Sequence, residues 1–319
     1  MAALVEIKNL KKYFKTSRGL VHAVDDVSMK IDHGSTMGVV GESGCGKSTL
    51  GRVLIQMIPP TDGRITFDGQ DVSYLRGTEL RKYHSRAQFI FQDPYSSLDP
   101  RYTVEQTISE PLKNEKKFSK SEIDKRTTEL MDMVGVAQRL RLSYPHEMDG
   151  GRRQRVVIAR ALALDPEFVV CDEPVSALDV SIQAQILNLL EDLQREKNLT
   201  YMFITHDMSV VRHISDNISV MYLGQLVETC ASKELFKTNY HPYTKALLSA
   251  IPSTNIHQKM NRIVLKGEIT SPINPPLGCR FAARCEYASP ECAMPQVLDE
   301  LTPDHFVACC RVREVNPGL

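Results

Sequence analysis

The most constraining stretch of this chain fits the pattern G-x-x-x-x-G-K-[ST] and consists of Gly41, Glu42, Ser43, Gly44, Cys45, Gly46, Lys47, Ser48 and Thr49. Residues 36–40 before it predict a short buried strand, and residues 50–58 after it predict a helix that stops at two prolines. A glycine-rich turn between a strand and a helix points backbone N–H groups at an anion, and the helix dipole adds positive potential. In this pattern the lysine reaches the β- and γ-phosphates, and the following hydroxyl holds Mg²⁺. The sequence therefore predicts a nucleoside triphosphate site rather than a tight glycine turn with a solvated lysine.

Length and charge exclude several classes of protein. The chain has 319 residues, with Lys+Arg and Asp+Glu balanced at 39 each, so it lacks the basic field that non-specific nucleic-acid binding requires. No apolar run approaches the roughly 18–20 residues needed to span a bilayer. The N-terminus carries charges where a signal peptide has an apolar core: Glu6, Lys8, Lys11 and Lys12. We expect a soluble, cytoplasmic protein with any membrane role supplied by a partner.

Two regions flank the predicted phosphate loop. Residues 5–8, 27–32 and 65–68 alternate apolar with polar side chains, which is typical of half-solvated antiparallel strands. Residues 93–150 change in character, because Ser119 and Glu122 form a capping-box pattern and helical spacing follows as far as Gly135. We expect a small β layer and a mostly helical insertion.

Carboxylates and a histidine follow two further apolar runs. Residues 168–171 lead into Asp172 and Glu173, and residues 201–205 lead into His206. Such runs are typical of buried parallel strands, and ligands of these sheets lie beyond the strands' carboxyl ends. The pattern predicts that Lys47, Asp172, Glu173 and His206 meet at one edge of a sheet.

Each of these residues has a functional and a structural interpretation. Asp172 fits a ligand of Mg²⁺, and Glu173 fits a base that accepts a proton from attacking water, although both could be solvated carboxylates of a turn. His206 fits a γ-phosphate contact, but lone histidines are often structural. Gln92 could report Mg²⁺ or the γ-phosphate to the helical insertion, or be merely exposed. Tyr13 offers a flat face for adenine, or packs as a core tyrosine.

Together these motifs resemble the nucleotide-binding subunits of ATP-binding-cassette (ABC) transporters. The resemblance covers about residues 4–250 and includes Gly150-Gly151 and the segment 176–179. It implies a RecA-like α/β core with an antiparallel β subdomain and an inserted helical subdomain. It also implies the following site: Tyr13 against adenine, the phosphate loop with Lys47 and Ser48, Gln92 of the Q-loop, Asp172 as Mg²⁺ ligand, Glu173 as catalytic base, Asp179 of the D-loop and His206 as the switch histidine.

Residues 91–101, 144–147, 241–248 and 278–309 look more specifically like those of dipeptide and oligopeptide importers. This implies an ABC ATPase domain over 1–240, a C-terminal extension over 241–319, and ATP hydrolysis coupled to peptide import. The implied partners are a second ABC ATPase subunit, two integral membrane permeases and an extracytoplasmic peptide-binding protein, with this chain at the cytoplasmic face of the membrane.

One motif departs from the family. The usual signature Leu-Ser-Gly-Gly-Gln is replaced by Met148-Asp149-Gly150-Gly151-Arg152. Asp149 suits the N-cap of the helix that follows, but it also sets a carboxylate against the γ-phosphate held by the opposing subunit. Because the signature completes the partner's site, we expect a heterodimer with one weakened ATP site.

The C-terminal extension carries a C-x₅-C-x₆-C-x₁₆-C pattern of Cys279, Cys285, Cys292 and Cys309. In a proline-rich tail without much core, a metal would be an effective staple. The spacing is wider than in most zinc sites, and similar importer tails are associated with a [4Fe–4S] cluster, so iron–sulfur is favoured, with zinc and free thiols as alternatives. Cys310 could substitute for Cys309. Cys45 is either only a small residue or an alkylation-sensitive thiol.

Two other function classes remain as rivals. A soluble cassette ATPase that acts on ribosomes or DNA usually carries two cassettes or a long coiled coil, and neither pattern occurs here. A small-molecule kinase or a GTPase would leave Gly150-Gly151 and His206 unexplained, and no Asn-Lys-x-Asp motif occurs.

Overall fold

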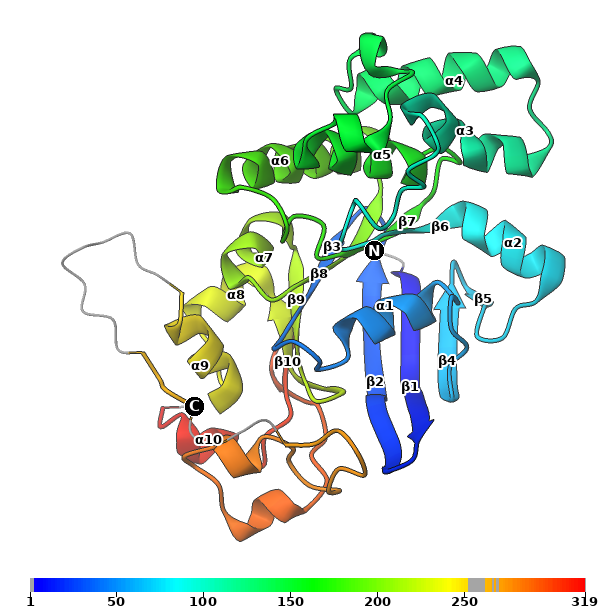
Figure 1. Ribbon diagram of the computed structural model, residues 1–319. Helices are drawn as coiled ribbons and strands as arrows, with labels where there is room; N and C mark the ends of the chain where they lie inside the picture. The colour runs from blue at the N-terminus through cyan, green and yellow to red at the C-terminus, as the bar shows by residue number, and fades with distance from the viewer. Residues whose placement is uncertain (1–2, 252–261, 266, 268–269, 319) are drawn as a thin grey trace. The chain divides into compact units, whose positions relative to one another are not determined.

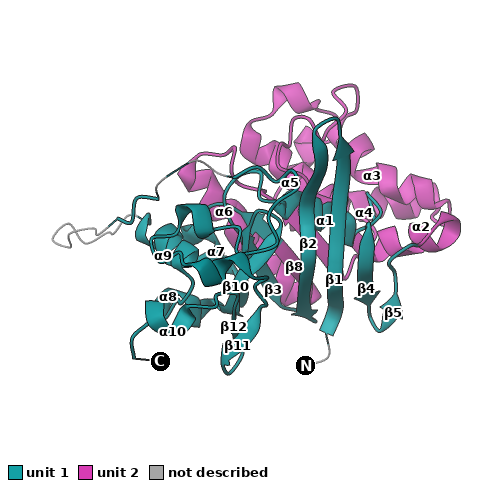
Figure 2. Cartoon of the chain, turned by 90° about the horizontal axis from the view of Figure 1, so that it is seen from below, with its two compact units in different colours: residues 1–74, 203–319 teal, residues 75–202 magenta. Residues whose placement is uncertain are grey.

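The computed structural model describes residues 3–251, 262–265, 267 and 270–318. The chain forms two compact units, one of residues 1–74 and 203–319 and the other of residues 75–202 (Figure 2). The sequence predicts a different division, at residue 240, and that division stays a prediction. Each unit is described by itself below.

The first unit contains an antiparallel sheet in the order β2-β1-β4-β5 (Figure 1). Its strands are β1 (Ala3–Thr16), β2 (Gly19–Asp32), β4 (Asp62–Phe67) and β5 (Gln70–Asp71). Val5 on β1 lies opposite Ile31 on β2 and Phe67 on β4, and all three side chains are buried. The predicted antiparallel layer is confirmed, because the alternating apolar side chains share one face of this sheet.

A second set of strands in this unit has the order β11-β12-β10-β9-β3. The strands are β3 (Thr36–Val40), β9 (Asn217–Tyr222), β10 (Gln225–Ala231), β11 (Asp299–Thr302) and β12 (His305–Val307). β3 and β9 run parallel, with Val40 opposite Val220, and both strands are almost wholly buried. β12 of the C-terminal extension pairs antiparallel with β10, so the extension docks onto the core by extending its sheet.

Short helices complete the first unit: α1 (Lys47–Leu54), α7 (Met208–Ile214), α8 (Ser232–Lys237), α9 (Pro242–Ser249), α10 (Val312–Val315), η3 (Ala282–Arg284) and η4 (Pro290–Ala293). The expectation of a helix over 50–58 was wrong at both ends. α1 begins at Lys47, because Gly46 is the N-cap, and it ends at Leu54, because Gln56 adopts a left-handed conformation before the prolines are reached.

The second unit is mostly helical. It contains α2 (Gly77–Arg86), β6 (Ala87–Ile90), α3 (Val104–Glu115), α4 (Lys120–Met133), η1 (Gln138–Leu140), η2 (Pro145–Glu147), α5 (Gly150–Ala161), β7 (Phe168–Asp172) and α6 (Val180–Lys197). The predicted capping box is present at α4, where the Ser119 hydroxyl accepts from the Glu122 N–H and the Glu122 carboxylate accepts from the Ser119 N–H. β8 (Thr200–Thr205) belongs to both units, because the division in the chain falls between Met202 and Phe203.

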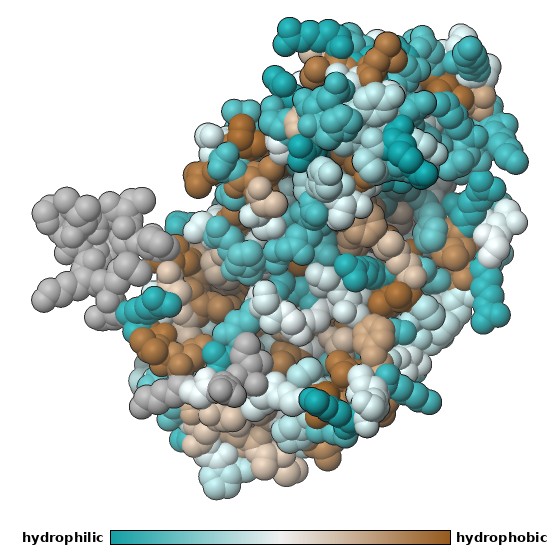
Figure 3. Space-filling model, viewed as in Figure 1, coloured by the Kyte–Doolittle hydropathy of each residue, from teal (hydrophilic) through white to brown (hydrophobic). Residues whose placement is uncertain are grey.

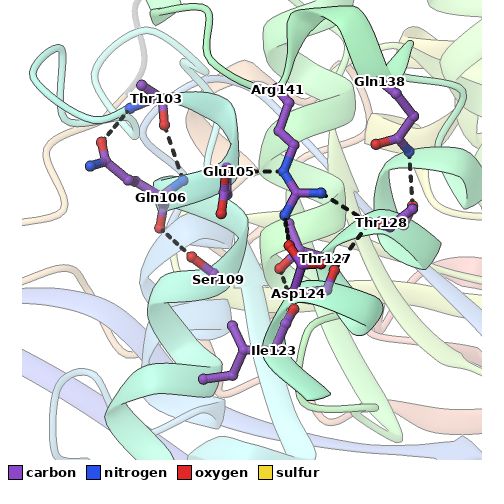
Figure 4. A network of polar contacts seen from close by, with 10 residues as sticks. All are labelled: Thr103, Glu105, Gln106, Ser109, Ile123, Asp124, Thr127, Thr128, Gln138 and Arg141. Atoms are coloured by element: carbon purple, nitrogen blue, oxygen red, sulfur yellow. Dashed lines mark hydrogen bonds and ion pairs between the residues drawn. The ribbon is translucent and has the colours of Figure 1, made fainter. Parts of the chain in front are cut away.

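An arginine joins the helices of this insertion. Arg141, after η1, donates to Glu105 on α3 at 3.0 Å, to Thr128 on α4 at 3.1 Å and to Asp124 on α4 (Figure 4). Because the guanidinium presents several donors in a fixed plane, one side chain can fix two helices and a loop relative to one another.

Candidate nucleotide-binding site

The phosphate loop lies between β3 and α1, as the sequence predicts. Gly41 and Gly46 both have positive φ angles, 156° and 108°. A Cβ atom on Gly41 would lie 2.1 Å from the Met221 carbonyl oxygen, and one on Gly46 would lie 1.9 Å from the Ala23 carbonyl oxygen. Glycine is therefore required at both positions for steric as well as conformational reasons.

Lys47 occupies the centre of this loop. Its side chain is only 5% exposed, and Nζ donates to the carbonyl oxygens of Gly41 at 2.7 Å and Glu42 at 3.0 Å. Ser48 and Thr49 follow in the first turn of α1 and are half-buried. The first-turn N–H groups have no partner within a helix, so ammonium, N–H groups and hydroxyls together form a suitable seat for phosphate.

Cys45 is a buried member of the loop. Burial raises the pKa of its thiol, and the nearby Lys47 ammonium only partly opposes this. The thiol is therefore protonated at neutral pH, which favours the interpretation as a small residue over that as a reactive thiol.

Tyr13 belongs to a polar cluster between β1 and β2. Its ring stacks on His22 with centroids 4.0 Å apart, and its hydroxyl donates to Asp25. His22 Nδ1 lies 3.0 Å from the second oxygen of Asp25. Burial raises the pKa of Asp25, but the bonds from Tyr13 and His22 outweigh it and hold the carboxyl pKa below its usual range. The orientation of Tyr13 is thus fixed by an ionised carboxylate.

His206 follows β8 and is exposed. The next residue, Asp207, caps α7 by accepting from the Ser209 N–H at 2.7 Å. His206 therefore lies in a short, fixed connection between a strand and a capped helix, as expected for a residue at the carboxyl end of a strand.

In the second unit, β6 and β7 are parallel neighbours, with Ile90 opposite Cys171. The chain leaves these strands through Gln92 and Glu173, and Gln92 Nε2 donates to Glu173 Oε2 at 2.9 Å. Asp172 is buried, whereas Glu173 is half-buried. Glu173 has a φ of 48°, a strained conformation for this residue type. Such strain often marks functional positions, and here it turns Glu173 toward the amide of Gln92.

The signature residues lie at the start of α5. Asp149 is the N-cap, its Oδ1 accepting from the Arg152 N–H at 2.8 Å, and its Oδ2 lies 3.3 Å from Arg152 Nε. A Cβ atom on Gly151 would lie 2.7 Å from Ile182 Cγ2 of α6, so the helices approach closely here. Asp179 occupies the N-cap position of α6 and is exposed.

The predicted site residues are thus divided between the units. The first unit holds Tyr13, the phosphate loop, and His206; the second holds Gln92, Asp149, Gly150, Gly151, Asp172, Glu173 and Asp179. Within the second unit the structure brings Gln92 and Glu173 into contact. The meeting of Lys47 with Asp172 and Glu173 stays a prediction.

The cysteines of the extension converge. Cys279, Cys285, Cys292, Cys309 and Cys310 line one small cavity of about 10 Å³, together with His241 and Arg311. Such a volume holds about one water. Within the described residues, no group of three or more His, Cys, Asp or Glu side chains is arranged to hold a metal ion. Burial raises the pKa of Cys279 to about 12 and that of Cys309 to about 11. The donor type fits a cluster or zinc, but these thiols are not arranged around a common metal position in the described residues.

The C-terminal extension contacts the phosphate loop, which the sequence pattern does not predict. Arg284 forms an ion pair with Glu42 at 2.7 Å, and the Tyr243 hydroxyl accepts from the Glu42 N–H at 2.9 Å. Arg280 pairs with Asp25. One signal was available in the sequence: an acidic residue inside an anion-binding loop calls for a compensating cation.

Comparison with known proteins finds relatives of both the nucleotide-binding part and the C-terminal extension. The ABC transporter family matches residues 24–176, and the oligopeptide/dipeptide transporter C-terminal region matches residues 227–292. The oligopeptide transport ATP-binding protein AppF of Bacillus subtilis (strain 168) is 50% identical over 318 residues, or 96% of each chain. The corresponding protein OppF of Salmonella typhimurium is 46% identical over 97% of this chain and 96% of its own length.

Solved structures of cassettes are similar as well. The dimeric post-hydrolysis state of the ATP-binding cassette MJ0796 bound to ADP and Pi matches with a TM-score of 0.66 and 30% identity, over 72% of this chain and 98% of that one. CbiO1 from Clostridium perfringens, part of the transporter complex cbiONQ, matches with a TM-score of 0.67 and 30% identity over 74% of this chain and 92% of that one. None of the helices in the described part of the chain has the length and apolar character of a membrane span. This chain therefore belongs to the family of ABC transporter ATP-binding proteins, in its oligopeptide and dipeptide transport branch.

Proposed function

We propose that this protein is the ATP-hydrolysing subunit that energises import of dipeptides or oligopeptides through an ABC transporter. The observation that carries the proposal is the similarity of cassette and C-terminal region together, over nearly the full chain, to oligopeptide transport ATP-binding proteins. The reaction is ATP + H₂O to ADP + phosphate. A soluble cassette ATPase acting on ribosomes or DNA is not favoured, because those relatives are transport proteins.

The chemistry is assigned to residues whose surroundings suit it. Lys47 would bind the β- and γ-phosphates, and Ser48 and Asp172 would hold Mg²⁺, which neutralises charge on the phosphates. Glu173 would accept the proton of the attacking water. Its contact with Gln92 orients the carboxylate and makes Gln92 a sensor that links nucleotide state to the helical insertion. His206 would contact the γ-phosphate.

We assign the permease contact to the second unit. Exposed apolar side chains occur on the segments next to Gln92 and the signature: Tyr95, Tyr102, Leu142 and Tyr144, with Leu142 72% exposed. On the face shown in Figure 3, polar side chains predominate over the helical part of this unit. We propose that these exposed apolar side chains make the contact with a permease loop.

The remaining partners follow from the same proposal. Two cassettes close on two ATP molecules, and the second cassette is a different subunit with an ordinary signature. An extracytoplasmic binding protein delivers the peptide, and this chain lies at the cytoplasmic face through its permeases. On this arrangement Asp149 faces the nucleotide bound by the second cassette.

We also propose that Cys279, Cys285, Cys292 and Cys309 bind a [4Fe–4S] cluster. The support is their convergence on one cavity, since a thiolate set can rearrange around a metal that it binds. Anaerobic purification should give a brown protein with absorbance near 400 nm and matching iron and sulfide. Stoichiometric zinc, or metal-free protein after anaerobic purification, would refute the cluster.

The function is tested with Glu173→Gln in the reconstituted transporter. ATP hydrolysis and ATP-dependent peptide uptake into vesicles should both fall at least 100-fold, because the water loses its base, whereas ATP binding should persist. Glu196→Gln, on the exposed part of α6, is the matched control and should leave both activities unchanged. Hydrolysis that survives Glu173→Gln would refute the catalytic role, and failure to co-purify with integral permeases would refute the transport role.

A further inference from the structure

The phosphate loop contains a glutamate whose negative charge would repel the phosphates that the loop binds. Glu42 follows Gly41 directly, in a loop whose N–H groups and Lys47 serve to bind a polyanion. A carboxylate within a few ångströms of a triphosphate repels it. At a protein surface the repulsion energy of such a like-charge pair is large enough to weaken binding. The structure must therefore either turn this charge away or neutralise it.

Arg284, from the C-terminal extension, neutralises Glu42. Its Nη1 donates to Glu42 Oε2 at 2.7 Å and its Nη2 donates to Oε1 at 3.1 Å, which is a bidentate pair. The Arg284 side chain is only 9% exposed and its guanidinium lies 6.0 Å from the Tyr222 ring centroid. A pair with this geometry and burial is held in place, unlike a solvated surface pair.

The backbone of the same loop residue is held by the C-terminal part of the chain too. The Glu42 N–H donates to the hydroxyl of Tyr243 on α9. Tyr243 packs on Tyr222 and on Phe281, with ring centroids 4.7 and 5.4 Å apart, and all three rings are buried. Phe281 lies in the same short segment as Arg284, so one packed cluster fixes both contacts to Glu42.

The segment reaches the Tyr13 side of the unit through Arg280. This arginine is buried and donates to the Leu223 carbonyl oxygen and to Asp25, the carboxylate that orients Tyr13. The neighbouring Gly224 N–H donates to the Cys45 carbonyl oxygen of the phosphate loop at 2.7 Å. The segment 280–284 therefore reaches the loop through Arg284 and Glu42, and it reaches Tyr13 through Arg280 and Asp25.

We propose that Arg284 is a positioning residue for ATP, which cancels the charge of Glu42 and thereby makes nucleotide affinity depend on the C-terminal extension. Arg280 supports the same site by fixing Asp25 and the turn at Gly224. The inference rests on the proposed ATP-binding function. Cys279 and Cys285, which line the cysteine cavity, are the chain neighbours of Arg280 and Arg284.

The experiment measures the dissociation constants of ATP and ADP for the purified full-length chain with a fluorescent nucleotide analogue. Arg284→Ala should weaken ATP binding about tenfold, and ADP binding less, because ATP carries more charge. Adding Glu42→Gln to Arg284→Ala should restore ATP affinity to within about twofold. Arg313→Ala, at an exposed arginine on α10 of the extension, is the control and should bind ATP like the unchanged chain.

The outcomes separate this inference from the function on which it rests. An unchanged chain that binds no ATP refutes the function, whereas normal ATP affinity of Arg284→Ala refutes the inference alone. If Glu42→Gln does not rescue ATP affinity, or if Arg313→Ala loses as much affinity as Arg284→Ala, the role of Arg284 is merely structural and the inference is refuted. If Arg284→Ala does not fold, Glu42→Gln alone still decides, since it should bind ATP at least as tightly as the unchanged chain, and weaker binding overturns the proposal.

Discussion

Replacement of Asp149 by serine isolates one charge in the signature motif. Asp149 caps α5 through its bond from the Arg152 N–H, and its side chain is 60% exposed. Serine caps helices about as well as aspartate, so Asp149→Ser should change the free energy of unfolding by less than about 0.5 kcal/mol. The perturbation therefore removes the carboxylate while leaving the helix start in place.

The magnitude follows from the charges at this helix end. A carboxylate about 4 Å from a phosphate oxygen, at an effective dielectric of about 20, raises the energy by about 4 kcal/mol. The Arg152 guanidinium, with Nε 3.3 Å from Asp149 Oδ2, offsets part of this. If the offset is about half, about 2 kcal/mol remains, which corresponds to a factor of about 30 in the occupancy of the composite site.

The assay is steady-state ATP hydrolysis by the assembled transporter at subsaturating ATP. Asp149→Ser should raise turnover, and Asp149→Asn, which keeps both size and cap, should do the same. Arg152→Gln should lower it, because the carboxylate then loses its counter-charge. Unchanged turnover in Asp149→Ser and Asp149→Asn would refute the idea that this carboxylate weakens one of two ATP sites.

Three further results are expected. Gly46→Ala should abolish nucleotide binding in a filter or fluorescence assay, because its Cβ would lie 1.9 Å from the Ala23 carbonyl oxygen; binding within threefold of normal would contradict this. Burial lowers the pKa of His241 to about 4, whereas a histidine in the unfolded chain has a pKa of about 6.5. As the pH falls below about 6.5, the unfolded state therefore binds the proton first. The free energy of unfolding should then decrease, by about 2 kcal/mol at pH 5. Urea unfolding of His241→Asn should show no such decrease at low pH. If the stability of the variant and of the unchanged chain fell in parallel with pH, the role of His241 would be contradicted. Cys45, which is buried, should react with N-ethylmaleimide far more slowly than the exposed Cys310, as mass spectrometry of modified peptides can show, and equal rates would contradict the burial.

The elements that the sequence predicts correctly are those specified by short-range rules. The capping box at Ser119 and Glu122 satisfies its N–H groups within four residues of chain. The phosphate loop is equally local, because Gly41 and Gly46 need backbone angles that other residues avoid. In contrast, the end of α1 depends on a left-handed Gln56 that no pattern indicates, and α2 went unpredicted.

Candidate site residues follow the same division. Gln92 and Glu173 can each be selected from a strand end, but their hydrogen bond arises from the parallel pairing of β6 with β7, 81 residues apart in the chain. The acid at Glu42 indicates that a compensating cation is needed, but it does not identify Arg284, which lies 242 residues away in the chain.

The sequence by itself determined the chemistry this chain can perform: a loop that binds phosphate, strand-end carboxylates and a cysteine-bearing extension, because glycine angles, capping and alternation act within a few residues. Only the tertiary structure decided which distant charges meet, namely Glu42 with Arg284 and Asp25 with Arg280. The physical reason is that a charge interacts through space with whatever the fold brings near it, and distance along the chain carries little information about that.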